Sequence, residues 1–180
     1  MLAALLALSR GIDFVNTWIG RAAAWAMFAA CLISFLNALS RYAFSRSSNF
    51  WLEIQWYLFG VMFMLAAAYV LKLNEHVRVD LFYGMLGHKK RIWVDIIGTL
   101  FFLMPACIVL GYLTFGMFWR SYITNEHSAN AVGLLVWPAL LMFPLGFALL
   151  FLQAISELIK RVEALSGEIE LDTTYEKPVQ

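Results

Sequence analysis

The stretch IWVDIIGTLFFLMPACIVLGYLTFGMF, residues 92–118, has a single charged side chain, Asp95, close to its start. A helix rises 1.5 Å per residue, so about 20 apolar residues cross the roughly 30 Å of hydrocarbon in a bilayer. The stretch therefore predicts a transmembrane helix that tilts or extends beyond the bilayer. Pro105 lies inside it, where neighbouring helices can satisfy the carbonyl group that a proline leaves free.

Three further apolar stretches have a similar length and predict helices of the same kind. They cover residues 18–39, 51–71 and 131–155. We expect an all-α integral membrane protein with four transmembrane helices, forming one domain over residues 1–163. Residues 164–180 are polar and acidic, which is typical of a loosely ordered tail.

Composition supports the membrane assignment. Of the 180 residues, 62% are hydrophobic and 14% are charged, whereas soluble domains are about half apolar and about a quarter charged. A short chain cannot bury that much apolar surface in one water-soluble core. The net charge of +1 gives no electrostatic reason to expect nucleic acid as a partner. Membrane lipid is the expected surrounding.

The distribution of basic residues predicts the orientation. Arg41, Arg46 and Arg120 are the only basic residues in the loops after the first and third stretches. The remaining Lys and Arg, of 13 in all, lie in the N-terminal segment, the loop after the second stretch and the C-terminal segment. Because basic residues favour the cytoplasmic side, we expect both termini, and hence the tail, to be cytoplasmic.

Two opposite charges lie at adjacent helix ends. Arg41 is at the end of the first stretch and Glu53 at the start of the second, and the turn between them is short. An ion pair that clamps this hairpin is the favoured interpretation, because an unpaired carboxylate in the membrane is costly. Contact with a partner subunit is the alternative.

The densest polar cluster is NEHVRVD, residues 74–80. Its alternating valines favour a short amphipathic helix on the cytoplasmic interface, in which His76, Arg78 and Asp80 bond to neighbouring helix ends or to another subunit. A metal site is disfavoured. The following basic patch, residues 88–91, is interpreted as an anchor for lipid phosphates.

The polar segment at residues 124–130 precedes the fourth stretch. Ser128 or Asn130 could cap the helix that follows. The alternative interpretation is that Asn130 and its neighbours form a surface presented to a periplasmic partner.

No catalytic, cofactor-binding or metal-binding constellation is found. A haem-binding membrane anchor would need axial histidines inside the bundle, whereas His76, His88 and His127 are predicted to lie in loops. A self-assembling small transporter or channel remains an alternative. It would be expected to carry a polar stripe at mid-membrane, but the main polar residues of the spans, Asn37 and Gln153, lie near the ends.

Three short motifs occur in a characteristic order: RYxF at residues 41–44, WxE at 51–53 and HxxxD at 76–80. Together they resemble the small membrane subunit, DctQ type, of tripartite ATP-independent periplasmic (TRAP) transporters, over roughly residues 11–163. That family typically has a second acid after the glutamate of the WxE motif, where this chain has Ile54. A role that needs a carboxylate pair is therefore in doubt.

The resemblance implies a multi-pass protein of the bacterial inner membrane and a division of labour. A periplasmic substrate-binding protein captures an organic acid, and a large multi-helix permease subunit carries the substrate and Na⁺ sites and moves like an elevator. The small subunit is expected to be a non-catalytic scaffold for the large one, and to help dock the binding protein. The transported acid is not specified by this chain.

Overall fold

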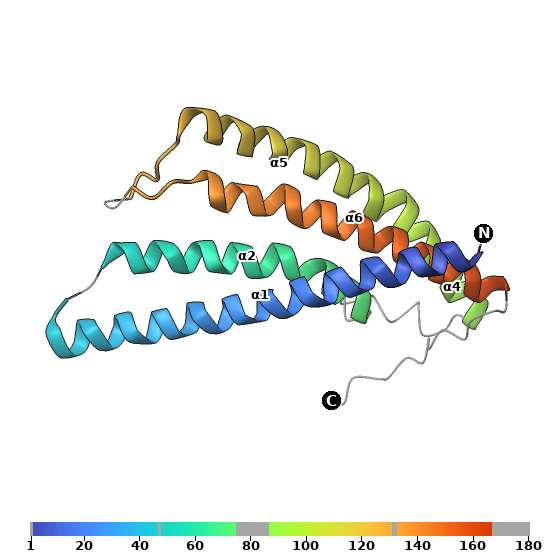
Figure 1. Cartoon of the computed structure of the whole chain (residues 1–180), viewed down its shortest axis with the longest axis horizontal. Helices are drawn as coiled ribbons and strands as arrows, with labels where there is room; N and C mark the ends of the chain where they lie inside the picture. Colours follow the sequence, from blue (N-terminus) through green and yellow to red (C-terminus); the bar gives the residue numbers. More distant parts are fainter. Residues whose placement is uncertain (1, 47, 75–86, 131–132, 167–180) are drawn as a thin grey trace.

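The computed structural model describes residues 2–46, 48–74, 87–130 and 133–166, and nearly all of them are helical. α4 continues through one π-helical segment, η1, directly into α5 (Figure 1). The elements are α1 (Leu2–Phe44), α2 (Asn49–Leu73), α4 (His88–Gly98), η1 (Thr99–Leu103), α5 (Met104–Thr124) and α6 (Trp137–Ser166).

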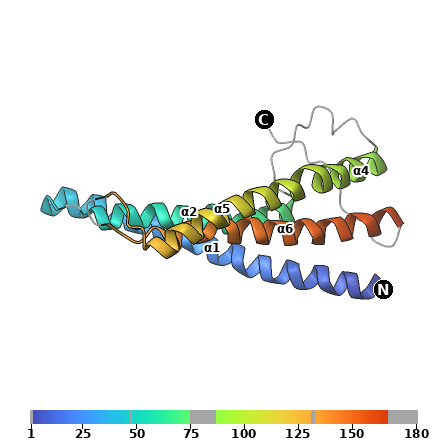
Figure 2. The ribbon, with the colours of Figure 1, turned by 90° about the horizontal axis from the view of Figure 1, so that it is seen from above.

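The long helices lie side by side in the order α1, α2, α6, α5 (Figure 1), and α6 also contacts α1. The start of α1, the start of α4 and the end of α6 lie together at what we call the termini end. The α1–α2 and α5–α6 connections lie at the opposite end, which we call the hairpin end. Seen from above, α1 and α4 diverge on either side of α6 toward the termini end (Figure 2).

Four helical segments are long and apolar enough to cross a membrane: Ala4–Phe44, Asn49–Leu73, Lys89–Thr124 and Trp137–Leu165. The all-α prediction with four transmembrane helices is thus confirmed. The first helix begins at Leu2 and extends well before the apolar stretch that starts at residue 18, and Ser9 and Asn16 in this extension are buried. The last helix begins at Trp137, not at residue 131.

The π-helical segment precedes a proline. The backbone N–H of Met104 bonds to the carbonyl of Thr99, five residues earlier. Pro105 has no N–H to give to the carbonyl four residues before it, so an i→i−4 ladder cannot continue through this point. A π-type bond is a common way for a helix to absorb such a defect.

Two glycines allow close helix contacts. A Cβ atom on Gly20 of α1 would lie 2.4 Å from the Cγ atom of Tyr69 in α2. One on Gly146 of α6 would lie 2.7 Å from the carbonyl oxygen of Met64. Small residues at such points let membrane helices approach closely. They bring α2 against both α1 and α6, which positions the polar groups described next.

Candidate functional site

Polar side chains are buried at the termini end. Asn16 of α1 is 1% exposed, and Gln153 of α6 is fully buried. We call the connected group of side chains here the polar network. It comprises Ser9, Asp13, Asn16, Thr17, Lys72, Asp95, Gln153, Ser156, Glu157, Lys160 and Arg161.

The spacing of these residues explains why they meet. Ser9, Asp13 and Asn16 follow one another at four and three residues, so they share one face of α1. Residues 153, 156, 157 and 160 share a face of α6 in the same way. Where the two helices cross, the polar faces meet and the apolar faces point outward.

Gln153 is the centre of the hydrogen bonds. Its Oε1 accepts from Nδ2 of Asn16 at 2.7 Å. Its Nε2 donates to Oδ1 of Asp13 at 2.8 Å and to Oε1 of Glu157 at 3.2 Å. The hydroxyl of Ser156 donates to the same Asp13 oxygen at 2.9 Å, and its own oxygen lies 2.7 Å from that of Ser9. These bonds replace water that the buried groups have lost, although Oδ1 of Asn16 has no partner.

Ion pairs extend the network. Lys160 pairs with Asp13, with Nζ 3.1 Å from Oδ2, and also with Glu157. Arg161 pairs with Glu157 at 2.6 Å and with Asp95 of α4 at 3.3 Å. Removing one member of such a buried pair costs far more than the pair contributes, because the other charge stays buried.

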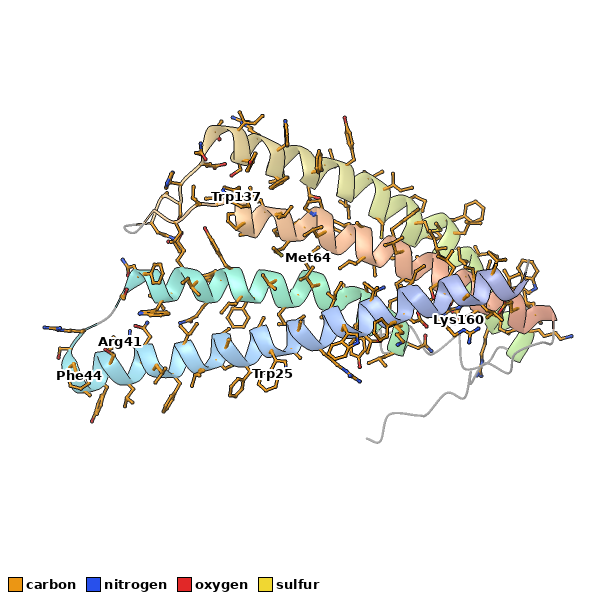
Figure 3. The ribbon with its side chains drawn as sticks, viewed as in Figure 1. Trp25, Arg41, Phe44, Met64, Trp137 and Lys160 are labelled. Atoms are coloured by element: carbon orange, nitrogen blue, oxygen red, sulfur yellow. The ribbon has the colours of Figure 1, made fainter. Side chains whose placement is uncertain are left out.

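A third cation links α2 to the network. The ammonium group of Lys72 donates to the Thr17 hydroxyl at 2.6 Å and to the Asp13 carbonyl at 3.3 Å. The network thus joins α1, α2, α4 and α6 where they meet. Lys160 lies at this crossing in Figure 3. The network contains three acidic and three basic side chains, so its formal net charge is zero.

The hairpin end contains a different kind of polar group. Glu53 is only 4% exposed, and its Oε2 has no hydrogen-bond partner. Among the described residues no ion pair joins it to Arg41, which is exposed on α1. The predicted clamp is therefore wrong.

The orientation of α2 explains why Glu53 does not pair with Arg41. Tyr57 lies one turn after Glu53, on the same face of α2. Its hydroxyl donates to the carbonyl of Leu135, at 3.0 Å, just before α6 begins. That face of α2 is turned toward α6, so Glu53 cannot point at α1 even though the turn between α1 and α2 is short.

The α5–α6 connection is folded back on itself. The N–H of Ser128 donates to the carbonyl of Leu134 at 2.8 Å, and the N–H of Val136 donates to that of Glu126 at 3.0 Å. Asn130 is exposed at the tip, and its carbonyl accepts from Gly133, whose φ is +64°.

Neither predicted cap is used by α6. That helix starts at Trp137, beyond the folded connection, and the Ser128 hydroxyl accepts from the N–H of Asn130 at 3.2 Å instead. The capping prediction was wrong because residues 133–136 form part of the connection. Asn130 as a partner contact stays a prediction. His76, Arg78 and Asp80 lie outside the described residues.

No group of three His, Cys, Asp or Glu side chains in the described ranges is arranged to hold a metal ion. The two cysteines are free, with Cys31 exposed and Cys107 buried.

The sequence prediction missed the polar network. Lys160 and Arg161 were interpreted only as basic residues that set the orientation. The available signal was the spacing of polar residues within apolar helices, at 9, 13 and 16 and again at 153, 156, 157 and 160. Such spacing places polar groups on one face, and in a membrane helix that face is expected to point inward.

Comparison with known families agrees with this architecture. The family of the DctQ component of tripartite ATP-independent periplasmic transporters matches residues 30–164, which is most of the chain. No curated protein sequence matches the chain closely enough to extend the comparison. The family is one of bacterial inner-membrane proteins, in agreement with the four spanning helices. The chain therefore belongs to the DctQ family, the small permease component of TRAP transporters.

Proposed function

We propose that this chain is a non-catalytic scaffold on which the large subunit of a Na⁺-driven TRAP transporter moves organic acids across the membrane. Family membership implies partnership with a large permease subunit and a periplasmic binding protein. The observation that carries the proposal is the position of the ionisable side chains along the spanning helices.

Those side chains are concentrated at the helix ends. The central part of every spanning helix lacks Asp, Glu, Lys and Arg: residues 22–40, 54–71, 96–119 and 137–156. Transporters place their substrate and ion sites near the bilayer midplane, using polar groups or broken helices there. This chain has no ionisable side chain in those central layers, which favours a scaffold over a substrate-carrying subunit.

The polar network supports rigidity. It connects α1, α2, α4 and α6 through bonds whose charged members are paired with one another. A scaffold against which another subunit slides must hold its shape, and a cross-linked end contributes to that. None of these groups needs to bind a substrate.

The proposal also assigns each end of the bundle to one side of the membrane and to a partner. With both termini cytoplasmic, the network lies on the cytoplasmic side and the folded α5–α6 connection lies on the periplasmic side. Asn130, exposed at the tip of that connection, would then face the binding protein. Arg41 and Glu53 would lie near the outer side of the membrane, where the large subunit can contact them. His76, Arg78 and Asp80 would contact it on the inner side.

Affinity purification from mild detergent tests the proposal. The tagged chain, expressed with the proteins encoded beside it, should retain a much larger hydrophobic polypeptide in stoichiometric amount. A chain that purifies only as assemblies of itself would contradict the scaffold role and favour the self-assembling channel. Cysteine labelling at both termini of the intact chain should be blocked in whole cells and restored after permeabilisation.

A further inference from the structure

An apolar groove lies between α2 and α6. It has a volume of about 360 Å³ and is lined by six α2 residues in the range 56–64 and by Phe143 of α6. Every lining side chain is apolar. Met64 lies between the two helices in Figure 3. A Cβ atom added to Gly60 would have no atom within 4 Å, so the floor of the groove is open at that point.

Glu53 stands at the hairpin end of this groove. Glu53, Gly60 and Met64 follow one another at seven and four residues, so they share one face of α2. Trp56, which lines the groove, lies one turn after Glu53. The groove therefore runs along α2 from the neighbourhood of the carboxylate toward the middle of the bundle.

The Glu53 carboxylate lacks a cation within the described residues. It is 4% exposed, it takes part in none of their ion pairs, and its Oε2 accepts no hydrogen bond. The nearby Tyr57 hydroxyl donates to the Leu135 carbonyl instead. An unpaired carboxylate at the membrane boundary is costly. A cationic donor from outside the chain would remove that cost.

The depth of the groove matches one leaflet of a bilayer. Glu53 directly precedes the uncharged stretch at residues 54–71, and the exposed Trp51 and Trp56 beside it are typical of a membrane interface. From Trp56 to Met64 the groove extends for about 12 Å. Half of a hydrocarbon layer of about 30 Å is roughly 15 Å. The polar end thus lies at headgroup level and the apolar end lies near the bilayer midplane.

We propose that Glu53 and the α2–α6 groove bind one phospholipid with a primary-amine headgroup, such as phosphatidylethanolamine. Its ammonium group donates to the Glu53 carboxylate, and one acyl chain occupies the groove. The deep position of Glu53 favours a compact ammonium group with three N–H donors. A transmembrane helix of a protein fits less well, because it would cross both leaflets whereas the lining ends at Met64.

This inference does not depend on the proposed function, because the site is built from this chain alone. A carboxylate has several acceptor positions. The large subunit can therefore contact Glu53 beside the bound lipid.

Headgroup selectivity tests the role of Glu53. Native mass spectrometry of the isolated chain in mild detergent would compare phosphatidylethanolamine, phosphatidylcholine and phosphatidylglycerol with identical acyl chains. We expect phosphatidylethanolamine to bind about tenfold more tightly than phosphatidylglycerol, which has no cation. Phosphatidylcholine, whose quaternary ammonium has no N–H, should lie between them. Glu53→Gln should bring all three affinities within about twofold of one another.

A second variant tests the groove. Gly60→Leu fills the open floor without changing the charge, so it should weaken the binding of all three lipids. We expect a loss of about tenfold, which corresponds to roughly two methylene groups that are no longer buried. Gly116→Leu in α5 is the matched control, because a Cβ atom there also has no atom within 4 Å. It should leave lipid binding unchanged, and both variants should keep the helical content of the wild-type chain.

The alternative occupants give different results. Equal binding of the three lipids to the wild-type chain, or an unchanged preference in Glu53→Gln, would overturn the headgroup site. Unchanged binding in Gly60→Leu would mean that the lipids only surround the helices, and it would also overturn the inference. Release of phosphatidylethanolamine from the wild-type chain when the large subunit binds would show that protein occupies the groove in the complex.

Discussion

The two ends of the bundle bury ionisable groups in opposite ways. At the termini end, Glu157 is bonded to Lys160, Arg161 and Gln153. At the hairpin end, Glu53 is buried with one carboxylate oxygen that has no partner. Leaving a buried polar group unsatisfied costs about 1–3 kcal/mol, and more when it is charged. The charged groups of the polar network are thus paired within the chain, and its one unsatisfied atom is the uncharged Oδ1 of Asn16, whereas the hairpin end has a buried carboxylate oxygen that an outside partner can satisfy.

The largest expected effect is at the centre of the network. Glu157→Ala would leave Lys160 and Arg161 without their shared carboxylate. Breaking a buried pair in this way costs about 3–5 kcal/mol, so the free energy of unfolding in detergent should fall by that amount. Glu157→Gln, which keeps an acceptor oxygen, should lose less. A loss below about 1 kcal/mol for the alanine variant would show that the network is not stabilising.

Gln153→Leu tests the uncharged part of the network. The substitution removes the acceptor of Asn16 and a donor to both Asp13 and Glu157. We expect a loss of about 1–3 kcal/mol in the free energy of unfolding.

A second substitution sharpens that test. Adding Asn16→Leu should recover part of the stability, because replacing both polar partners by apolar groups can be nearly neutral. Strictly additive losses in the double variant would contradict the direct coupling of these two side chains.

At the hairpin end, Tyr57→Phe removes the hydroxyl that donates to the Leu135 carbonyl. One such bond contributes about 0.5–1.5 kcal/mol. Amide hydrogen exchange in residues 133–136 should become faster, while exchange at the termini end stays unchanged. Unaltered protection of residues 133–136 would mean that this bond does not hold the connection against α2.

The smallest expected effect is that of Glu53→Gln in the isolated chain. The chain leaves Oε2 of the Glu53 carboxylate unpaired, so the amide breaks no ion pair within the chain and the free energy of unfolding should not fall. Retention of the large subunit should nevertheless fall, because the partner would lose the negative charge that strengthens the bond it donates. If Glu53→Gln destabilises the isolated chain as much as Glu157→Gln does, the contrast between the two ends is wrong.

Hydropathy alone was sufficient to predict the number of spanning helices, because a helix surrounded by lipid needs a long apolar run. It does not show how far the first helix extends before residue 18, since Asp13 and Asn16 interrupt the apolar pattern yet face inward. The proposed Arg41–Glu53 pair failed for a related reason. Nearness along the chain indicates which helix ends meet, but the rotation of α2 against α6 decides where Glu53 points. That rotation depends on packing contacts such as the one between Gly146 and Met64.

The most direct test of the scaffold account is a flux measurement in proteoliposomes with an inward Na⁺ gradient and the loaded binding protein outside. Vesicles containing this chain alone should show no uptake of the organic acid above protein-free vesicles. Vesicles with both membrane subunits should take it up, and those with the large subunit alone should do so poorly. Substrate-dependent uptake into vesicles that contain only this chain would contradict the account.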